Sequence, residues 1–300
     1  MTEDKCAICD YEGSDYQERF WDRGGRNYED RVEAIALQRL LPASGARLLD
    51  IGAGAGRNVP RYGNFNQIVL LDYARTQLEK AQDKLGNDNR YLYVVADAYR
   101  LPFANDVFDA AVMIRTLHHM IDPLAALKQV RSVTSPDASF VLEFANKRNL
   151  KSILRWLVRQ QEWNPFEKNP IEFAPLNFNF HPQSVRNWLK TAQFDVERQL
   201  TVSHFRIGIL KRVVPLGLLV RLDAMIQRTG KLWQLTPSVF VQSRARGEWQ
   251  TDPGDAFWRC PSCNSIELVE IKNGIQCVEC GRVWGLKDGI FDFKTPVGGG

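Results

Sequence analysis

The stretch that decides the fold is Asp50-Ile51-Gly52-Ala53-Gly54-Ala55-Gly56-Arg57. It closes a short apolar run, residues 47–51 (RLLDI), with three glycines at alternating positions. Glycines at a turn from a strand to a helix let the backbone bend sharply, and they let a ligand approach where a Cβ would collide. The stretch therefore predicts that the first strand of a sheet ends at a nucleotide-like cofactor.

The spacing of these glycines indicates which cofactor to expect. A dinucleotide-binding loop reads Gly-x-Gly-x-x-Gly, and counted from Gly52 its third glycine would fall on Arg57. The pattern here is acid-x-Gly-x-Gly-x-Gly, with Asp50 as the acid. A carboxylate beside the cofactor repels a pyrophosphate and attracts an ammonium group. We therefore expect S-adenosyl-L-methionine, which carries an ammonium group and a sulfonium.

Outward from this loop, apolar runs alternate with segments of helical periodicity. Strands are expected at residues 47–51, 67–71, 91–96, 108–114, 139–144, 194–202 and 238–243. Helices are expected at residues 28–41, 74–85 and 122–133. This alternation is typical of the α/β class, with a doubly wound, mostly parallel sheet covered by helices on both faces in a Rossmann-like fold.

Acids recur at the carboxyl ends of the first three expected strands. Asp72 follows Asp50 by 22 residues, where an acid can accept hydrogen bonds from the ribose hydroxyls. Asp97, beside Ala98, can accept from the adenine amine. A single Asp at a strand end is more often a helix cap or a turn former. Three on successive strands, at the edge where open α/β sheets bind ligands, favour a cofactor site.

Residues 28 to 145 resemble the core of class I methyltransferases of the type 11 family. The resemblance rests on LLDIGAGAGRN, LLDYARTQLEKAQ, VVADAYRLPFANDVFDAAVMIRTLHHM and DPLAALKQVRSV, in this order. It implies that Asp50, Gly52 and Gly54 line the methionine end of the cofactor, Asp72 the ribose, and Asp97 with Ala98 the adenine. Gly56, Tyr73 and Arg115 complete the expected cofactor-binding set. The segment from Arg115 to His119 is implied to face the reacting sulfonium.

The candidate catalytic residues are the two histidines after the fourth expected strand, His118 and His119. A hydroxyl or amine acceptor must lose a proton, and an imidazole with a pKa near neutral can take it. The alternative is that histidines at the start of a helix cap it or pack. Glu143, Asn146, His181 and His204 rank behind these two.

Two long interruptions separate the last three expected strands. Residues 145–182 carry six aromatic side chains, and residues 205–235 include an apolar stretch broken by charged residues, Pro215 and Gly217. We expect both to be helical caps over the ligand end of the sheet, where they would exclude water and align the methyl donor and acceptor. An ordinary helical subdomain is the alternative. A methyltransferase domain is expected over residues 1–250, with its core at 47–145.

The C-terminal cysteines predict a metal site. Cys260, Cys263, Cys277 and Cys280 form two Cys-x-x-Cys pairs separated by 13 residues, which suits a closed tetrahedral Zn2+ site of structural type. Between them, a strand, an Asn-Gly turn and a second strand are expected. Residues 257–294 resemble the small zinc-ribbon activators of methyltransferases, although two prolines of their usual ending are absent. Cys6 and Cys9 form a further pair, where we expect no metal.

The net charge of +4 is unevenly distributed. Residues 147–248 carry 17 lysines and arginines against 7 acids. Such a segment suits an anionic substrate, RNA or a membrane surface, and it also suits a merely solvated helix face. The N-terminal residues 1–12 lack an apolar signal segment, and no run of 18 apolar residues occurs, so we expect a cytoplasmic protein.

Three functions remain open from the sequence. The first is a methyltransferase that acts on a small-molecule or lipid-like acceptor, with peripheral membrane contact as one option and with a structural zinc ribbon. The second is an RNA methyltransferase that grips phosphates with the ribbon and with Lys147, Lys151, Arg155 and Arg159. The third is a non-catalytic binding module that keeps the cofactor fold, and the intact strand-end acids oppose it. The sequence does not indicate the oligomeric state.

Overall fold

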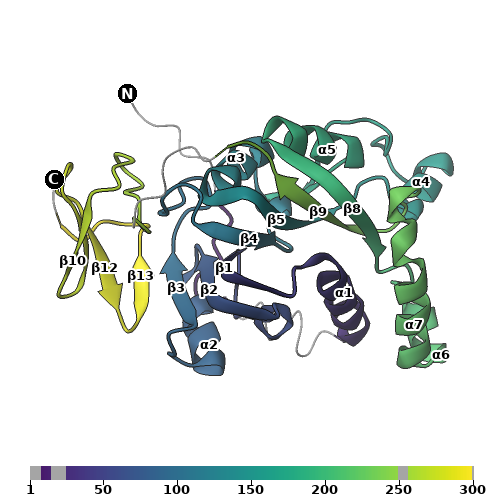
Figure 1. Cartoon of the computed structure of the whole chain (residues 1–300). Helices are drawn as coiled ribbons and strands as arrows, with labels where there is room; N and C mark the ends of the chain where they lie inside the picture. Colours follow the sequence, from purple (N-terminus) through teal and green to yellow (C-terminus); the bar gives the residue numbers. More distant parts are fainter. Residues whose placement is uncertain (1–7, 15–24, 249–255, 299–300) are drawn as a thin grey trace.

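The structure is a computed structural model of the 300-residue chain, and it describes residues 8–14, 25–248 and 256–298. Its central feature is an eleven-stranded sheet in the order β10-β11-β12-β13-β3-β2-β1-β4-β5-β9-β8 (Figure 1). The strands of this sheet are β1 (Ser44–Ile51), β2 (Asn64–Asp72), β3 (Tyr91–Val95), β4 (Phe108–Met113), β5 (Thr134–Ala145), β8 (Phe194–Val202), β9 (Ser238–Ala245), β10 (Leu268–Ile271), β11 (Gly274–Cys277), β12 (Val283–Lys287) and β13 (Ile290–Asp292). A separate hairpin consists of β6 (Ile171–Ala174) and β7 (Asn177–Asn179).

The helices alternate with the strands along the first half of the chain. The α-helices are α1 (Asn27–Leu40), α2 (Arg75–Leu85), α3 (Pro123–Val133), α4 (Leu150–Leu157), α5 (Pro182–Thr191), α6 (Gly208–Val213) and α7 (Leu216–Ile226). Short 3-10 turns are η2 (Val59–Arg61), η3 (Leu117–His119) and η4 (Gln227–Lys231). Every strand and helix expected in the core forms within a few residues of its expected bounds, and β5 begins earliest relative to expectation, at Thr134.

The core of the sheet is parallel from β3 through β2, β1 and β4 to β5, and β9 lies antiparallel between β5 and β8. Successive residues of β2 point to opposite faces, where Val69 and Leu71 join one buried cluster and Ile68 and Leu70 join the other. Burial on both faces explains why these strands are continuous apolar runs. The expected doubly wound α/β class is confirmed.

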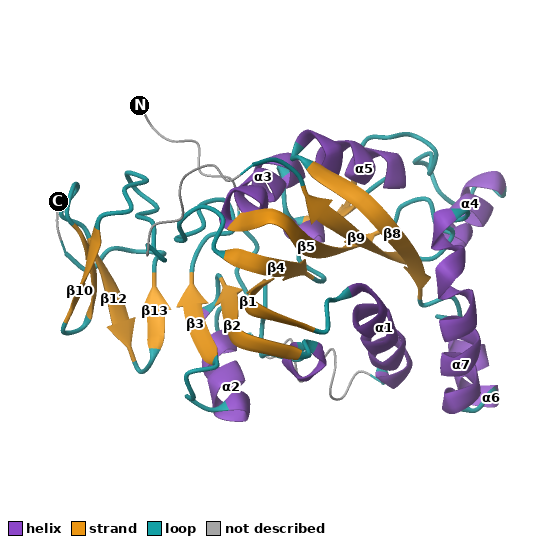
Figure 2. Ribbon diagram, in the orientation of Figure 1, coloured by secondary structure: helices purple, strands orange, loops and turns teal. Residues whose placement is uncertain are grey.

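Helices cover the two faces of the sheet in pairs (Figure 2). On one face α1 and α2 contribute buried side chains such as Leu37 and Leu78, and on the other α3 and α5 contribute Val130 and Val185. The carboxyl ends of β1, β2, β3 and β4 therefore meet at an edge that these helices leave accessible.

The cysteine-rich segment continues the central sheet. β13 pairs in parallel with β3, with Ile290 opposite Tyr93, and the backbone N–H of Phe293 donates to Val95 O at 2.8 Å. Trp258 stacks on Phe103 of the core, with 5.6 Å between the ring centroids. The sequence predicts a separate module at residues 257–294, and nothing in it indicates this shared sheet.

The hairpin of this segment differs from the expected one in its turn. Ile271 pairs with Gly274, so the two loop residues are Lys272 and Asn273, and not Asn273 with Gly274. Gly274 is instead the first residue of β11, where a Cβ would lie 2.1 Å from the carbonyl oxygen of Trp284. The glycine is therefore required by the close approach of β12 and not by the turn.

The two insertions take different positions. The first brings the β6–β7 hairpin against η3. The second packs α7 against α1, where the hydroxyl of Tyr28 donates to Asp223 Oδ2 at 2.6 Å. Within the second insertion, which was expected as a cap over the ligand end of the sheet, α7 lies beside α1 and η4 lies beside β8.

Candidate active site

The glycine-rich loop is fixed to the end of β2. The backbone N–H groups of Gly52 and Ala53 both donate to Leu71 O, at 2.8 and 3.0 Å. Gly52, Gly54 and Gly56 have φ angles of 73°, 53° and 68°, a left-handed conformation that other residues adopt at a cost. The loop conformation therefore explains all three glycines without any ligand.

The three glycines differ in the space that a Cβ would find beside them. A Cβ on Gly52 would lie 2.1 Å from Thr116 Oγ1, and one on Gly56 would lie 2.9 Å from Leu85 of α2. A Cβ on Gly54 would meet no described atom within 4 Å. Gly54 therefore faces open space, whereas Gly52 and Gly56 allow close packing.

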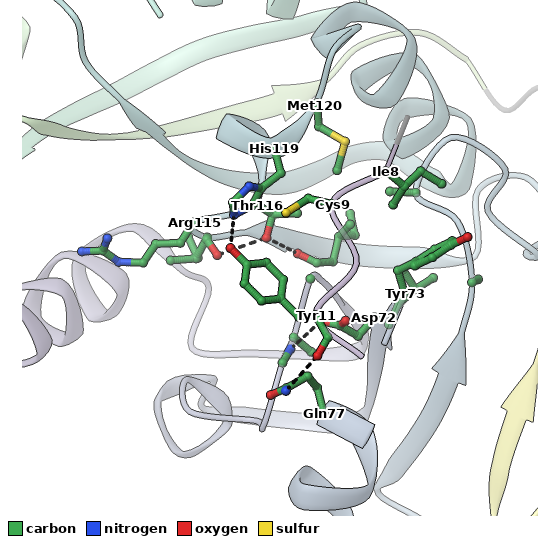
Figure 3. Close-up of a pocket in the computed structure, with 18 of the residues that line it drawn as sticks. Ile8, Cys9, Tyr11, Asp72, Tyr73, Gln77, Arg115, Thr116, His119 and Met120 are labelled. Carbon is green, nitrogen blue, oxygen red and sulfur yellow. Dashed lines mark hydrogen bonds between the residues drawn. The ribbon is translucent and has the colours of Figure 1, made fainter. Parts of the chain in front are cut away.

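The loop forms one wall of a cavity at the carboxyl ends of β1 to β4 (Figure 3). The expected cofactor-binding or catalytic residues that line it are Gly52, Gly54, Asp72, Tyr73, Asp97, Ala98, Arg115 and His119. Apolar side chains such as Leu71, Ile114 and Met120 complete its walls. Asp50, Gly56 and His118 are not among the lining residues.

Asp72 holds the loop as well as facing the cavity. Its Oδ2 accepts from the N–H of Gly54 at 2.8 Å, and its Oδ1 accepts from the N–H of Ala74 at 2.9 Å. Burial raises the pKa of Asp72, and the backbone donors oppose this effect. Asp97 also accepts a backbone hydrogen bond, because its Oδ1 lies 2.8 Å from the N–H of Tyr99.

Asp50 lies behind the loop. Leu49 and Ile51 belong to one buried cluster, so the alternation along β1 directs Asp50 to the other face, where it accepts from the hydroxyl of Tyr62 at 2.6 Å. Burial raises the pKa of Asp50 to about 7. The structure thus gives Asp50 a buried hydrogen bond rather than a place on the cavity wall, and its role toward the methionine end stays a prediction.

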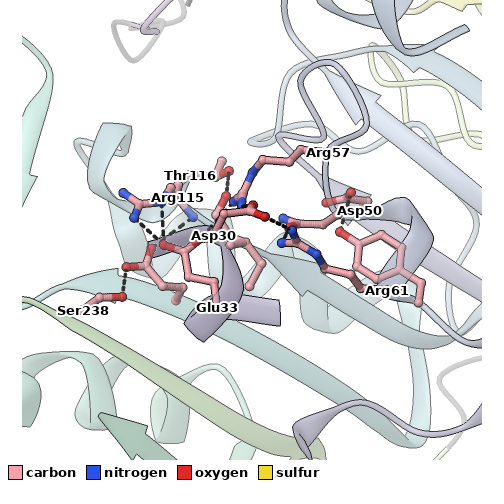
Figure 4. Close-up of polar contacts among 12 residues, drawn as sticks. Asp30, Glu33, Asp50, Arg57, Arg61, Arg115, Thr116 and Ser238 are labelled. Carbon is pink, nitrogen blue, oxygen red and sulfur yellow. Dashed lines mark hydrogen bonds and ion pairs between the residues drawn. The ribbon is translucent and has the colours of Figure 1, made fainter. Parts of the chain in front are cut away.

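Arg115 is held by a buried acid that the sequence analysis missed (Figure 4). Glu33 of α1 is fully buried and forms ion pairs with Arg115 and, at 2.9 Å, with Arg57. Burial alone would raise the pKa of Glu33, but the two arginines hold it below its usual range. Asp30 bridges Arg57 to Arg61 at 2.5 and 2.6 Å. The signal in the sequence is an acid on the apolar face of the first helix.

The N-terminal segment, residues 8–14, covers one side of the cavity. Ile8, Cys9 and Tyr11 line it, as Figure 3 shows. The carboxylate of Glu12 accepts from the N–H groups of Arg75 and Thr76 at 2.8 and 3.2 Å, so it caps the start of α2. Sequence reasoning gave this segment no role, and Cys6 lies outside the described residues.

The hydrogen bonds of His119 determine which ring nitrogen carries the proton. Its Nδ1 lies 3.0 Å from Leu176 O, which can only accept, so Nδ1 donates. Its Nε2 then accepts from the hydroxyl of Tyr11 at 3.2 Å. Burial lowers the pKa of His119, and the hydrogen bond to Leu176 opposes this effect. At neutral pH the ring therefore offers a lone pair to Tyr11.

A second cavity adjoins the first. Tyr11 and Arg115 line both cavities, and His118 lines only the second. The remaining walls are mostly polar and include Glu143, Asn146, Asn149, Phe173, Asn177, Asn179, Arg206 and Ser238. The first insertion thus supplies side chains from its hairpin, whereas the second supplies Arg206.

His118 and Glu143 are the buried ionisable groups of this second cavity. His118 Nδ1 is buried and has no hydrogen-bond partner in the described part of the chain. Burial, followed by the nearby charges of His119 and Arg115, holds the pKa of His118 well below its usual range. Burial raises the pKa of Glu143, whose carboxylate accepts from Ser238 Oγ at 2.6 Å and from the N–H of Arg115 at 3.1 Å.

The three remaining candidate residues each make hydrogen bonds that stabilise the fold. His181 accepts from the N–H of Gln183 and caps α5, and His204 contacts Asp223 Oδ2 at 3.0 Å. Neither histidine lines either cavity. Asn146 lines the second cavity, but its Nδ2 donates to Gln234 O and Thr236 O.

The four C-terminal cysteines converge as the spacing predicts. Their Sγ atoms all lie within 4.8 Å of one another. Cys260 Sγ is 3.7 Å from Cys280 Sγ, and Cys263 Sγ is 3.5 Å from Cys277 Sγ. Zn–S bonds of about 2.3 Å in a tetrahedron place sulfur atoms about 3.8 Å apart. The donor set and its spacing therefore fit one tetrahedral Zn2+.

Comparison with known proteins identifies the core. Residues 49–142 match the family described as a methyltransferase domain. This part of the core is therefore similar in sequence to methyltransferase domains. An S-adenosylmethionine-dependent methyltransferase from Mesorhizobium loti shares the fold with a TM-score of 0.52 at 19% identity, over 71% of this chain and 97% of that one. A complex of the Haloferax volcanii Trm112 methyltransferase activator with a methyltransferase gives a TM-score of 0.53 at 15% identity, over 75% of this chain and 94% of that one.

Curated relatives match less than half of this chain. The 27-O-demethylrifamycin SV methyltransferase of Amycolatopsis mediterranei is 30% identical over 43% of this chain and 51% of its own length. The malonyl-[acyl-carrier protein] O-methyltransferase of Geobacter sulfurreducens is 31% identical over 44% of this chain and 53% of its own length. The chain thus spans about half the length of these relatives.

Proposed function

We propose that the chain is an S-adenosylmethionine-dependent methyltransferase whose acceptor, a small molecule or lipid-like compound, binds in the second cavity. The observation that carries the proposal is the shared wall of the two cavities, formed by Tyr11 and Arg115. A methyl donor in the first cavity and an acceptor in the second would meet at this wall. Holding the two in line contributes about 7–11 kcal/mol to such a reaction.

The residues of the first cavity fit the cofactor. Gly54 leaves open space at the loop, and the carboxylates of Asp72 and Asp97 lie at the ends of the next two strands, where ribose and adenine groups can donate to them. When bound, S-adenosylmethionine supplies a methyl group that its sulfonium already activates. The protein's part is then to orient the acceptor, to exclude water and to take a proton.

We assign the proton transfer to His119 acting through Tyr11. The hydroxyl of Tyr11 donates to His119 Nε2 and can accept a hydrogen bond from an acceptor hydroxyl in the second cavity. As the acceptor gives its proton to Tyr11, Tyr11 gives its own to Nε2, while Leu176 O holds the ring in place. The buried and unpartnered Nδ1 of His118 offers an additional hydrogen bond to the acceptor.

A contact of Lys147 favours a small-molecule acceptor over RNA. The RNA hypothesis uses four basic residues, of which the first is Lys147. Lys147 is buried, and its Nζ donates to Asn169 O at 2.7 Å, so it does not point toward a phosphate. The relatives named above are described as methyltransferases of 27-O-demethylrifamycin SV and of malonyl-[acyl-carrier protein].

Two measurements test the proposal. Titration calorimetry should show S-adenosylmethionine binding that Asp72→Ala weakens, and wild-type affinity in this variant would contradict the assignment. Incubation with a cofactor labelled in its methyl group and with a fractionated cell extract should then transfer label to a small-molecule or lipid fraction. Label in RNA would instead support the second function.

For the C-terminal segment, we propose a structural role for Zn2+ held by Cys260, Cys263, Cys277 and Cys280. Four thiolates leave no coordination position for a substrate. The segment that they organise supports β3, whose end carries Asp97 and Ala98 of the cofactor cavity.

A further inference from the structure

Helix α4 turns its apolar stripe away from the protein. Leu150, Leu154 and Leu157 recur at the spacing of one helix face, and all three are exposed. Among the residues of α4, all of which the structure describes, Ser152 alone is buried. An amphipathic helix normally packs such a stripe onto the core. This one leaves it facing outward.

Helix α7 repeats the arrangement. Leu218, Leu222 and Met225 form an exposed stripe, while Leu219 and Asp223 on the opposite side are buried against α1. The exposed fraction rises from 39% at Leu222 to 75% at Met225. α7 therefore packs with one face and leaves a second apolar face without a partner in the described part of the chain.

The two stripes belong to one end of the molecule. In Figures 1 and 2, α4 lies above α7 and α6 at the right of the view. Leu232 and Trp233, which follow η4, are 80% and 62% exposed, and the N–H of Leu150 at the start of α4 donates to Leu235 O at 2.8 Å. We call residues 150–159, α6, α7 and residues 227–233 the docking surface. Apolar exposure on this scale marks an interaction site.

The charge of the docking surface has one sign. Asp223 is the one acid in residues 205–235, and it is buried against Tyr28 and His204. Exposed cations lie among the apolar side chains, namely Lys151, Arg155, Arg159, Arg212, Arg221, Arg228 and Lys231. The partner must therefore offer both an apolar interior and a negative surface.

We infer that the docking surface binds the face of an anionic phospholipid bilayer. Leucine, methionine and tryptophan side chains would enter the boundary between headgroups and acyl chains, and the arginines and lysines would contact the lipid phosphates. A nucleic acid would explain the cations but not the exposed aliphatic side chains. No helix among the described residues is long and apolar enough to cross a membrane, so the contact is with one face of the bilayer.

The docking surface also adjoins the second cavity. Asn149, which caps α4, and Arg206, which lies two residues before α6, both line that cavity. An acceptor bound there would therefore lie beside the membrane. The membrane contact itself does not depend on the proposed methyl transfer.

Vesicle sedimentation tests the inference on the full chain. The protein should sediment with vesicles of phosphatidylcholine and phosphatidylglycerol, and much less with phosphatidylcholine alone. Leu154→Glu combined with Met225→Glu should weaken binding to the mixed vesicles by at least about tenfold, because two exposed apolar side chains that would enter the bilayer become charged. Val278→Glu, at an exposed position of the cysteine-rich segment, is the matched control and should bind as the wild type does.

A charge series completes the test. Arg155→Glu with Arg228→Glu should also weaken binding, and Lys272→Glu should not. All variants should keep the wild-type affinity for S-adenosylmethionine and the same melting temperature, which separates docking from the proposed catalysis. Equal binding by the double leucine–methionine variant and its control would overturn the inference. So would RNA binding in place of vesicle binding, or a self-association that the same variant abolishes.

Discussion

The glycine-rich loop and the cysteine cluster are both sites built on tight turns, but their supports differ. The loop lies on two large buried clusters and is fixed by backbone hydrogen bonds to β2 and by Asp72. The cysteines organise a short segment that contacts the core through the β13–β3 pairing, the stacking around Phe103 and backbone hydrogen bonds such as that from the N–H of Ala104 to Phe257 O. We therefore expect the loop to keep its shape without a ligand, and the cysteine-rich segment to fold only with its ion.

The largest effect should follow metal removal. Zinc binding should supply on the order of 10 kcal/mol to the folding of the cysteine-rich segment. We expect one zinc per chain by elemental analysis, its loss in Cys260→Ser or Cys277→Ser, and proteolysis of residues 256–298 in the metal-free protein. Cys9→Ser, at the cofactor cavity, should keep the zinc. The fragment 1–250 should still bind S-adenosylmethionine, and a metal-free tail that resists proteases would contradict the comparison.

The next effect concerns the glycine-rich loop side of the comparison. The stability of the fold should depend on pH through Asp50, which lies behind the loop. Its folded pKa of about 7 lies above the ordinary value of 3.8 for an aspartic acid, so the fold prefers the protonated acid. This contribution is fully present below about pH 4 and is lost as the pH rises through 7, by about 4 kcal/mol. Asp50→Asn keeps an acceptor for Tyr62 and stays neutral. Denaturant melts should therefore show the variant more stable than wild type at pH 8, with the difference vanishing near pH 4.

Loss of the proposed base should come next. His119→Gln keeps a donor for Leu176 O but removes the basic nitrogen, so kcat should fall by about a hundredfold with little change in cofactor affinity. His181→Gln, which changes a helix-capping histidine outside both cavities, is the control and should retain activity. An unchanged kcat in His119→Gln would exclude this histidine as the base.

The smallest effect on stability should come from Gly54→Ala. The left-handed φ of 53° should cost about 1–2 kcal/mol, and the added methyl group should enter the open cavity and weaken cofactor binding. Gly25→Ala is a matched control, because Gly25 also has a left-handed φ, of 61°, and open space, shortly before α1. Both variants should lose similar stability, and an equal loss of cofactor affinity would show that Gly54 has no special position.

The sequence predicted those features that depend on short stretches. Each of these features depends on residues that are close together in the sequence. They are the strand-end acids, the glycine-rich loop and the two Cys-x-x-Cys pairs, and the structure contains all of them. It did not predict contacts that depend on distant pairs, such as Glu33 with Arg115, Tyr11 with His119, or His119 with Leu176. These pairs are separated by 82, 108 and 57 residues, so only the folded topology brings them together.

The expectations that the structure corrects or leaves incomplete also depend on contacts between residues that are distant in the sequence. The alternation along β1 directs Asp50 to Tyr62 and not to the cavity wall, and the sequence alone does not place Tyr62 there. The apolar residues of α7 looked like a cap, but Tyr28 and Asp223 fix that helix beside α1 instead. Gly274 was assigned to a turn, although the reason for it is the neighbouring strand β12.

The pairing of β13 with β3 has a consequence for the solution behaviour of the protein. Without β13, β3 would be the outermost strand of the sheet, with a row of unsatisfied N–H and C=O groups and with Phe103 uncovered. Such a strand is a template on which other chains can add. The cysteine-rich segment therefore protects the sheet against aggregation. If zinc holds this segment folded, its loss would leave β3 as an unpaired edge strand that promotes aggregation, while the rest of the domain stays folded.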